Sequence, residues 1–162
     1  MATMVDQKAE QGLTLTMTRV IRAPRERVFS AWLRPETIRQ WFGPEHRKVE
    51  DVQVDGRLGG RYEITMSPAH SPENCPNDHA PREKVAVRGE YKEISPYDRL
   101  SFTWCGDWNP TEESLVTISL REVEGGTEMT LEHTRFGSEA SLAGHEKGWE
   151  HGLDSMVKLL EG

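Results

Sequence analysis

The sequence predicts an α+β fold in which a curved, seven-stranded antiparallel sheet surrounds one long C-terminal helix, with two short helices between the first and second strands. Apolar and polar residues alternate in seven short stretches, which is the pattern of half-buried strands. Most of these stretches are joined by connections that suit hairpins, and hairpins imply antiparallel pairing. The chain ends in one long segment with helical periodicity, which alone has enough apolar length to cover a face of the sheet.

The N-terminal third should contain one strand and both short helices. Alternation predicts the first strand over residues 13–21. Pro24 suits the first turn of a helix, because the missing N–H would have no partner there. Pro35 ends this helix and opens the second one, which Gly43–Pro44 terminates.

The period then changes from 3.6 to 2, which predicts six more strands. Their apolar positions lie within Val49–Val54, Tyr62–Met66, Val85–Tyr91, Leu100–Trp104, Val116–Leu120 and Met129–His133. Gly125–Gly126 is a two-residue hairpin signal between the last two strands. Residues 67–83 contain four prolines and no periodicity, so we expect a long exposed loop.

The helical period returns after Ser138, which can cap the helix with its side chain. Apolar and aromatic residues recur at steps of three and four: Leu142, His145, Trp149, Leu153, Met156 and Leu160. Gly144, Gly148 and Gly152 follow one another at four-residue steps, although each costs about 1 kcal/mol relative to alanine. The glycines allow either a close approach of the helix to the sheet or room for a ligand, and the pattern does not distinguish the two.

Length and composition indicate one globular domain over residues 12–162, preceded by a flexible N-terminus over residues 1–11. The chain has 162 residues, a net charge of −7 and 29% charged residues. Such an acidic chain is not expected to bind nucleic acid. No apolar run is long enough to span a membrane and no signal peptide is evident, so we expect a cytoplasmic protein without a membrane partner.

The charge is unevenly distributed along the chain. Residues 1–62 hold 11 basic and 8 acidic side chains, and nine of the arginines lie between Arg19 and Arg61. A basic patch for an anionic partner is one interpretation, and ordinary solvated faces are the favoured one.

Motifs for catalysis are largely missing. His145–Glu146 resembles the start of a zinc-protease motif, but Trp149 stands where the second histidine belongs. His133 and His145 could exchange protons near neutral pH, although two structural histidines are the simpler interpretation. Arg19 could meet an anionic ligand, or more simply pair with an acid. No catalytic residue is therefore predicted.

Metal binding is not predicted either. His70, Cys75 and His79 lie in the proline-rich loop, but three ligands at this spacing are one short of a closed zinc site. We therefore expect neither a metal nor a cofactor.

The residues expected to face inward include many large aromatic side chains with polar tips. An apolar space with a few polar groups is typical of a small-molecule site. The alternative is an ordinary core filled by its own aromatic rings. Trp32 is expected to pack the short helices and Trp108 to lie in a loop. The candidate ligand-binding residues are Trp41, Phe42, Tyr62, Ile64, Tyr91, Phe102, Trp104, His133, His145, Trp149 and Leu153.

Taken together, features over about residues 13–160 resemble a known family. The residues that carry the resemblance are Arg19, Ala23–Phe29, Trp32, Trp41–Pro44, Asp55, Gly59–Gly60, Gly89–Pro96, Arg99–Leu100, Gly126–Thr127, Met129–Leu131 and Gly148–Trp149. With these residues, the sequence is similar to the heat-shock-protein-90 ATPase activator C-terminal-like group of the START/SRPBCC superfamily. The resemblance implies the helix-grip fold of the birch pollen allergen, with a deep pocket for apolar ligands.

Three hypotheses follow for the function. The leading one is a binding protein for a small hydrophobic or amphipathic molecule. The second is an enzyme resembling polyketide cyclases, in which His133, His145 or Arg19 would assist proton transfer. The third is a chaperone-interacting module that uses the basic segment 19–61; it is disfavoured, because the ATPase activator works with an additional N-terminal domain for which this chain has no length. A homodimer also remains open.

Overall fold

The structure is a computed structural model that describes residues 13–43, 47–68 and 84–162. The expectations for the N-terminal segment 1–11 and for the His70, Cys75 and His79 cluster lie outside these residues. The elements in chain order are β1 (Leu13–Ile21), α2 (Arg25–Ala31), α3 (Pro35–Trp41), β2 (Arg47–Val54), β3 (Arg61–Pro68), β4 (Val85–Ser95), β5 (Arg99–Gly106), β6 (Ser114–Val123), β7 (Gly126–Phe136) and α4 (Glu139–Glu161).

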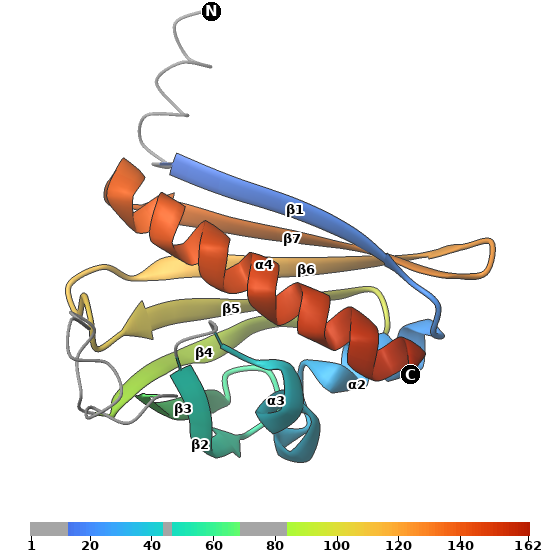
Figure 1. The fold of residues 1–162 in the computed structure, drawn as a ribbon, viewed down its shortest axis with the longest axis horizontal. Helices are drawn as coiled ribbons and strands as arrows, with labels where there is room; N and C mark the ends of the chain where they lie inside the picture. The colour runs from blue at the N-terminus through green and yellow to red at the C-terminus, as the bar shows by residue number, and fades with distance from the viewer. Residues whose placement is uncertain (1–12, 44–46, 69–83) are drawn as a thin grey trace, which may run out of the picture.

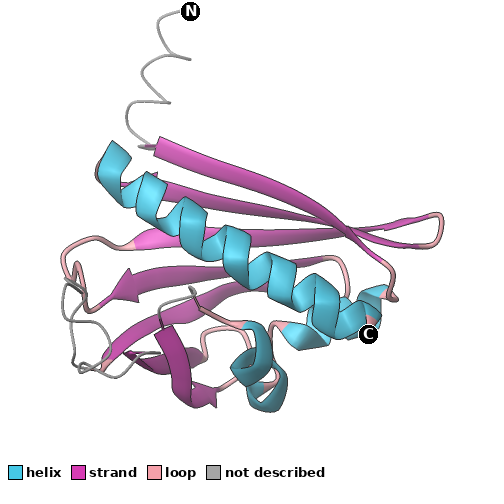
Figure 2. Cartoon of the chain, in the orientation of Figure 1, coloured by secondary structure: helices cyan, strands magenta, loops and turns pink. Residues whose placement is uncertain are grey.

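The seven strands form one antiparallel sheet in the order β1-β7-β6-β5-β4-β3-β2. Figure 1 shows the sheet curving beneath α4, with α2 and α3 closing one end. The helices and strands are distinguished by colour in Figure 2. The predicted α+β architecture is therefore confirmed.

The β6–β7 hairpin differs from the prediction by one residue. Val123 pairs with Gly126, so the two loop residues are Glu124 and Gly125 rather than Gly125 and Gly126. Gly125 has φ +83°, a left-handed conformation that glycine adopts without a steric penalty. The turn therefore needs glycine at its second loop position, while Gly126 already belongs to the strand.

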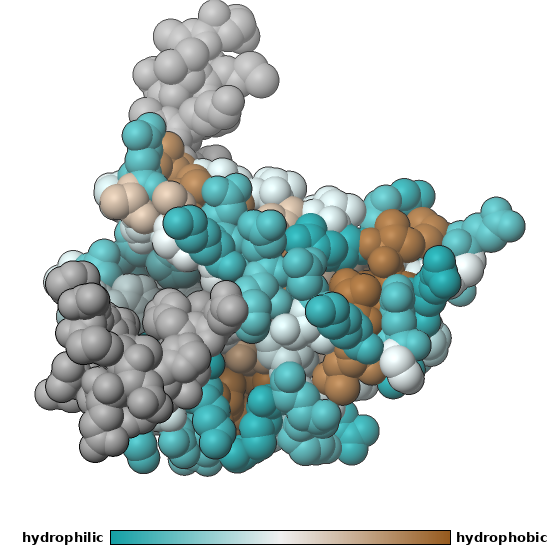
Figure 3. Space-filling model, viewed as in Figure 1, coloured by the Kyte–Doolittle hydropathy of each residue, from teal (hydrophilic) through white to brown (hydrophobic). Residues whose placement is uncertain are grey.

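Helix α4 is anchored at both ends. The Ser138 Oγ atom accepts a hydrogen bond from the Ser141 N–H at 3.1 Å, which satisfies a free donor of the first turn. At the other end, Arg27 Nη1 donates to the Leu160 carbonyl at 2.7 Å. The outward side of the helix is hydrophilic, as Figure 3 shows for this face of the molecule.

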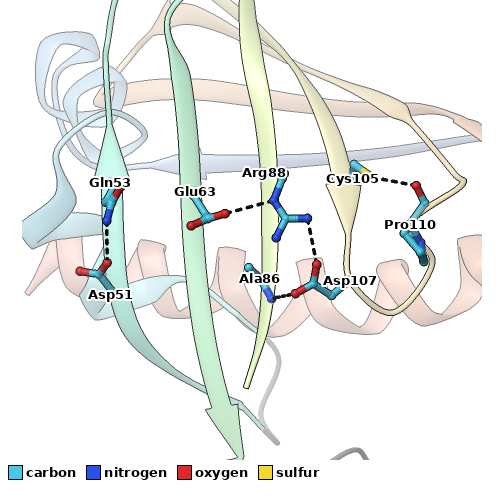
Figure 4. Close-up of polar contacts among 8 residues, drawn as sticks. All are labelled: Asp51, Gln53, Glu63, Ala86, Arg88, Cys105, Asp107 and Pro110. Atoms are coloured by element: carbon cyan, nitrogen blue, oxygen red, sulfur yellow. Dashed lines mark hydrogen bonds and ion pairs between the residues drawn. The ribbon is translucent and has the colours of Figure 1, made fainter. Parts of the chain in front are cut away.

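The sheet face opposite α4 carries a network of charged side chains (Figure 4). Arg88 donates to Glu63 at 3.0 Å and to Asp107 at 2.8 Å, while the second Asp107 oxygen accepts from the Ala86 N–H at 2.9 Å. The hydrogen bond from Arg88 lowers the pKa of Asp107. All three charged side chains remain partly exposed, so this face is a solvated, ion-paired surface.

Arginines of the basic segment also pair within the chain. Arg34 pairs with Glu36 at 2.9 Å, Arg57 with Asp55 at 2.9 Å, and Arg25 with Asp98. These pairs favour the interpretation of solvated, internally neutralised faces over that of a single basic patch.

The core lies between the concave sheet face and α4. The inward-facing strand residues predicted from the alternation are all buried: Tyr62, Ile64, Met66, Val87, Tyr91, Phe102, Trp104, Ile118, Met129, Leu131 and His133. Trp32 packs on Trp41 of the short helices as predicted, with ring centroids 4.8 Å apart. It also reaches Trp149 at 5.8 Å, so it belongs to the main core as well.

Candidate functional site

The centre of the core is nearly filled by aromatic side chains. It leaves a cavity of about 20 Å³, which has room for roughly one water molecule. Its walls are made by Trp32, Ile38, Trp41, Phe42, Val54, Tyr62, Ile64, Tyr91, Phe102 and Trp104. The interior by itself is therefore too small for a metabolite-sized ligand.

A much larger space, of about 520 Å³, opens between the N-terminal half of α4 and the ends of β3, β4 and β5. We call this space the groove. Its size falls within the range of small-molecule sites, about 300–1,000 Å³. Its described lining residues are Phe42, Gly43, Arg47, Met66, Val85, Trp104, Trp108, Asn109, Ser138, Ala140, Ser141, Gly144, His145, Gly148 and Trp149.

The two walls of the groove differ in character. The sheet side presents large apolar side chains, among them Met66, Trp104 and Trp108. The helix side presents small residues, including Gly144 and Gly148. His145 and Trp149 also line the groove from the helix, so the small residues form only part of this wall.

The glycines of α4 have two different surroundings. A Cβ atom at Gly144 would meet no described atom within 4 Å, and this glycine faces the groove. A Cβ atom at Gly152 would lie 3.6 Å from the Trp41 carbonyl oxygen, where α4 packs closely on α3. Open space is therefore found at Gly144, and close packing is found at Gly152.

His145 borders the groove but both of its ring nitrogens are occupied. Its Nε2 atom accepts from the Trp104 indole N–H at 3.1 Å, and its Nδ1 atom lies 2.8 Å from the Ser141 carbonyl oxygen. An indole N–H can only donate and a carbonyl can only accept. The imidazole is therefore neutral, with its proton on Nδ1, and burial lowers its pKa.

His133 lies deeper and has the opposite tautomer. Its Nδ1 atom accepts from the Trp149 indole N–H at 2.9 Å, so Nε2 carries the proton and donates to Ser114 Oγ at 2.7 Å. The Ser114 hydroxyl then donates to the Trp104 carbonyl at 3.2 Å. Burial lowers the pKa of His133 to about 2, and repulsion by His145 adds to this effect.

The two imidazoles therefore do not form an acid–base pair. Their ring centroids are 5.1 Å apart, yet each is hydrogen-bonded to other groups in its neutral form. This arrangement supports the interpretation of His133 and His145 as structural residues.

Glu112 links the two sides of the groove at the end where α4 begins. Its carboxylate accepts from the Gly137 N–H at 2.6 Å and from the Ser141 hydroxyl at 2.7 Å. The β5–β6 connection, which also carries Trp108, is thereby tied to the first turn of the helix. Both walls are held together at this end.

Arg19 lies away from the groove, on β1. Its Nε atom donates to Asp154 of α4 at 3.2 Å, and its Nη1 atom donates to the Thr18 carbonyl at 3.0 Å. Of the two roles considered from the sequence, pairing with an acid is the observed one.

The predicted ligand-binding residues fall into three groups. Phe42, Trp104, His145 and Trp149 line the groove. The small central cavity is lined by Trp41, Phe42, Tyr62, Ile64, Tyr91, Phe102 and Trp104. His133 and Leu153 belong to neither lining and are fully buried in the core.

Tyr62 shows why polar tips in this interior do not indicate a ligand. Its hydroxyl donates to the Thr103 carbonyl at 2.6 Å, and burial raises its pKa. No buried side-chain nitrogen or oxygen of the described residues lacks a hydrogen-bond partner.

Trp108 is the main groove residue that the sequence prediction missed. It was expected to lie in a loop, which it does, but its ring packs 5.8 Å from that of His145. The ring also covers Gly106, where a Cβ atom would overlap it at 2.3 Å. The nearby glycine is the signal that could have indicated a tryptophan folded back onto the strand.

Within ranges 13–43, 47–68 and 84–162, no group of three or more histidine, cysteine, aspartate or glutamate side chains is arranged to hold a metal ion. Over the same ranges, none of the helices combines the length and apolarity needed to cross a membrane.

Solved structures with the same fold come from several bacteria. Protein CV1439 from Chromobacterium violaceum is 26% identical, with a TM-score of 0.78 over 92% of this chain and 98% of that one. The AHSA1 protein SPO3351 from Silicibacter pomeroyi is 23% identical, with a TM-score of 0.76 over 91% of this chain and 97% of that one. DynU16, a protein of the dynemicin biosynthetic locus, is 19% identical, with a TM-score of 0.68 over 91% of this chain and 47% of that one.

A comparison with curated proteins gives no match. A family model does match, and it covers residues 22–161, which include all of the described groove residues. The chain belongs to the family of activator of Hsp90 ATPase homolog 1-like proteins.

Proposed function

We propose that this protein binds a small hydrophobic or amphipathic molecule in the groove. The observation that carries the proposal is a space of about 520 Å³ between large apolar side chains of the sheet and a helix wall where small residues stand beside His145 and Trp149. Burial of apolar surface in such a site contributes about 25 cal/mol to the free energy of binding for each Å² that is removed from water. The family and its fold are consistent with ligand binding of this kind.

The three residues considered for proton transfer, His133, His145 and Arg19, favour binding over catalysis. His145 has both ring nitrogens in hydrogen bonds to the protein, and His133 and Arg19 line no part of the groove. An enzyme resembling polyketide cyclases would need at least one such group free to exchange a proton with the substrate. DynU16 belongs to a biosynthetic locus, but at 19% identity its likeness to this chain shows a shared fold and no shared function.

The cytoplasm as compartment stays a prediction from the sequence, a homodimer stays open, and a chaperone partner stays the disfavoured alternative. The internal ion pairs of the basic segment give the chaperone hypothesis no additional support. The groove therefore remains the feature on which the proposal rests.

Titration with 8-anilinonaphthalene-1-sulfonate, followed by fluorescence, tests the proposal. We expect saturable binding by the unmodified protein and at least tenfold weaker binding by Gly144→Trp, whose indole would fill the groove. Glu146→Trp is the matched control, because residue 146 is exposed on another side of the same helix. Equal binding by Gly144→Trp and the unmodified protein, or no saturable binding at all, would overturn the proposal.

A further inference from the structure

The groove and the small central cavity share two lining residues, Phe42 and Trp104. On the groove side these residues meet Met66, Trp108 and the helix. On the core side they face a different set of rings, from Tyr62, Tyr91 and Phe102. The two spaces therefore adjoin at Phe42 and Trp104.

The two dividing side chains are held very differently. Trp104 is buried and is fixed by the hydrogen bond from its indole N–H to His145. Phe42 is half-buried, and its benzyl group has no polar atom through which it could be tied. Its ring contacts those of Trp104 and Trp149, at centroid distances of 5.8 Å and 6.1 Å. Phe42 is thus the part of the division that can change without breaking a hydrogen bond.

The residues on either side of Phe42 are each held by a hydrogen bond. The Trp41 indole N–H donates to the Ala31 carbonyl at 2.8 Å, and the Gly43 carbonyl lies 3.1 Å from His151 Nδ1. Gly43 has φ +102°, a conformation that few other residues would tolerate. The position from which the Phe42 ring enters the lining of both spaces is consequently well defined.

We propose that Phe42 determines the specificity of the groove by setting its depth. Its ring closes the groove toward the aromatic core and so limits the length of the apolar chain that a ligand can bury. Removing the ring joins the groove to the central cavity and lets a longer chain reach Tyr62 and Phe102. This inference rests on the proposed function, since depth matters only if the groove holds a ligand.

The test measures binding of n-alkanols, from hexanol to dodecanol, by displacement of 8-anilinonaphthalene-1-sulfonate. Affinity should rise about fourfold for each CH₂ group that becomes buried, and then level off when the chain reaches the bottom of the groove. In Phe42→Ala, we expect the levelling to move to longer chains, with dodecanol bound at least fourfold more tightly than by the unmodified protein.

Trp108→Ala is the matched control, because Trp108 lines the groove but not the central cavity. It should weaken all of the alcohols together and leave the chain length of levelling unchanged. Circular dichroism verifies that each variant is folded. If Phe42→Ala does not fold, Phe42→Leu replaces it. In Phe42→Leu the chain length at which affinity levels off should also increase, by a smaller amount.

The outcomes separate the two proposals. If the unmodified protein binds neither the dye nor any alcohol, the proposed function fails. If it binds them, but the folded Phe42 variant levels off at the same chain length, the function stands and the role of Phe42 is overturned.

Discussion

The indole N–H of Trp149 and the Nδ1 atom of His133 lie 2.9 Å apart, in a hydrogen bond that joins α4 to β7 inside the core. The bond requires His133 to be neutral, because a protonated ring would have no acceptor at Nδ1. A second indole, that of Trp104, imposes the same condition on His145. The stability of the fold is therefore coupled to the protonation of two histidines.

Stability should fall as the pH decreases below about 6.5. Both pKa values are lower in the folded protein, that of His133 at about 2, whereas an unfolded histidine titrates near 6.5. Below pH 6.5 the unfolded chain therefore binds more protons than the folded one. The free energy of unfolding should decrease by up to about 1.4 kcal/mol per pH unit for each histidine.

Urea unfolding between pH 7.5 and 5 measures this dependence, above the range in which most carboxylates titrate. His133→Gln keeps a donor and an acceptor but cannot be protonated, so its stability should depend less on pH. An unchanged slope in this variant would show that His133 is not the group responsible.

Replacing Trp149 by phenylalanine should cost more stability than the same change at Trp104. Trp149→Phe leaves the fully buried Nδ1 atom of His133 without a donor, which should cost about 2–3 kcal/mol. Trp104→Phe frees the Nε2 atom of His145, which borders the groove and can accept from water instead. Chemical denaturation of both variants makes the comparison, and equal losses would contradict the role given to the deeper hydrogen bond.

Gly144→Ala should stabilise the protein by about 1 kcal/mol, because alanine favours the helix and the added Cβ atom meets no described atom within 4 Å. Gly89→Ala should do the opposite, since its Cβ atom would lie 1.9 Å from the Thr103 carbonyl oxygen. Thermal unfolding of the two variants should show shifts of opposite sign. If Gly144→Ala were less stable than the unmodified protein, the added methyl group would have to clash with a neighbour, and the space at residue 144 would not be open.

Glu112→Ala should lower the free energy of unfolding by about 1–2 kcal/mol, since two hydrogen bonds to a charged acceptor are lost. Amide hydrogen exchange should accelerate at Gly137 and in the first turn of α4. The neighbouring Glu113 is exposed, so Glu113→Ala is the control and should change neither quantity. Unaltered exchange in Glu112→Ala would exclude the tether.

The fold could be predicted from periodicity because each strand buries one face, which fixes the alternation of side chains. The same pattern placed Tyr62, Tyr91 and Phe102 on the inner face correctly. It could not show that these rings nearly fill the interior, because the remaining volume depends on rotamers and on how closely the elements pack. The larger space is instead the groove, where Trp108 and two glycines of α4 are part of the lining.

The polar residues illustrate the same limit. The sequence favoured an acidic partner for Arg19, but that partner, Asp154, is 135 residues away in sequence. The pairing of each indole with one histidine likewise depends on the three-dimensional crossing of α4 over the sheet. Such long-range partners leave no mark on local sequence patterns.

The tether formed by Glu112 has a consequence for the energetics of recognition. Because it joins the β5–β6 connection to the start of α4, the walls at this end of the groove are already fixed in the ligand-free protein. A ligand therefore does not have to order them, and the associated loss of conformational entropy occurs during folding rather than during binding. Under the proposed function, one carboxylate thus couples the affinity of the groove for its ligand to the stability of the fold.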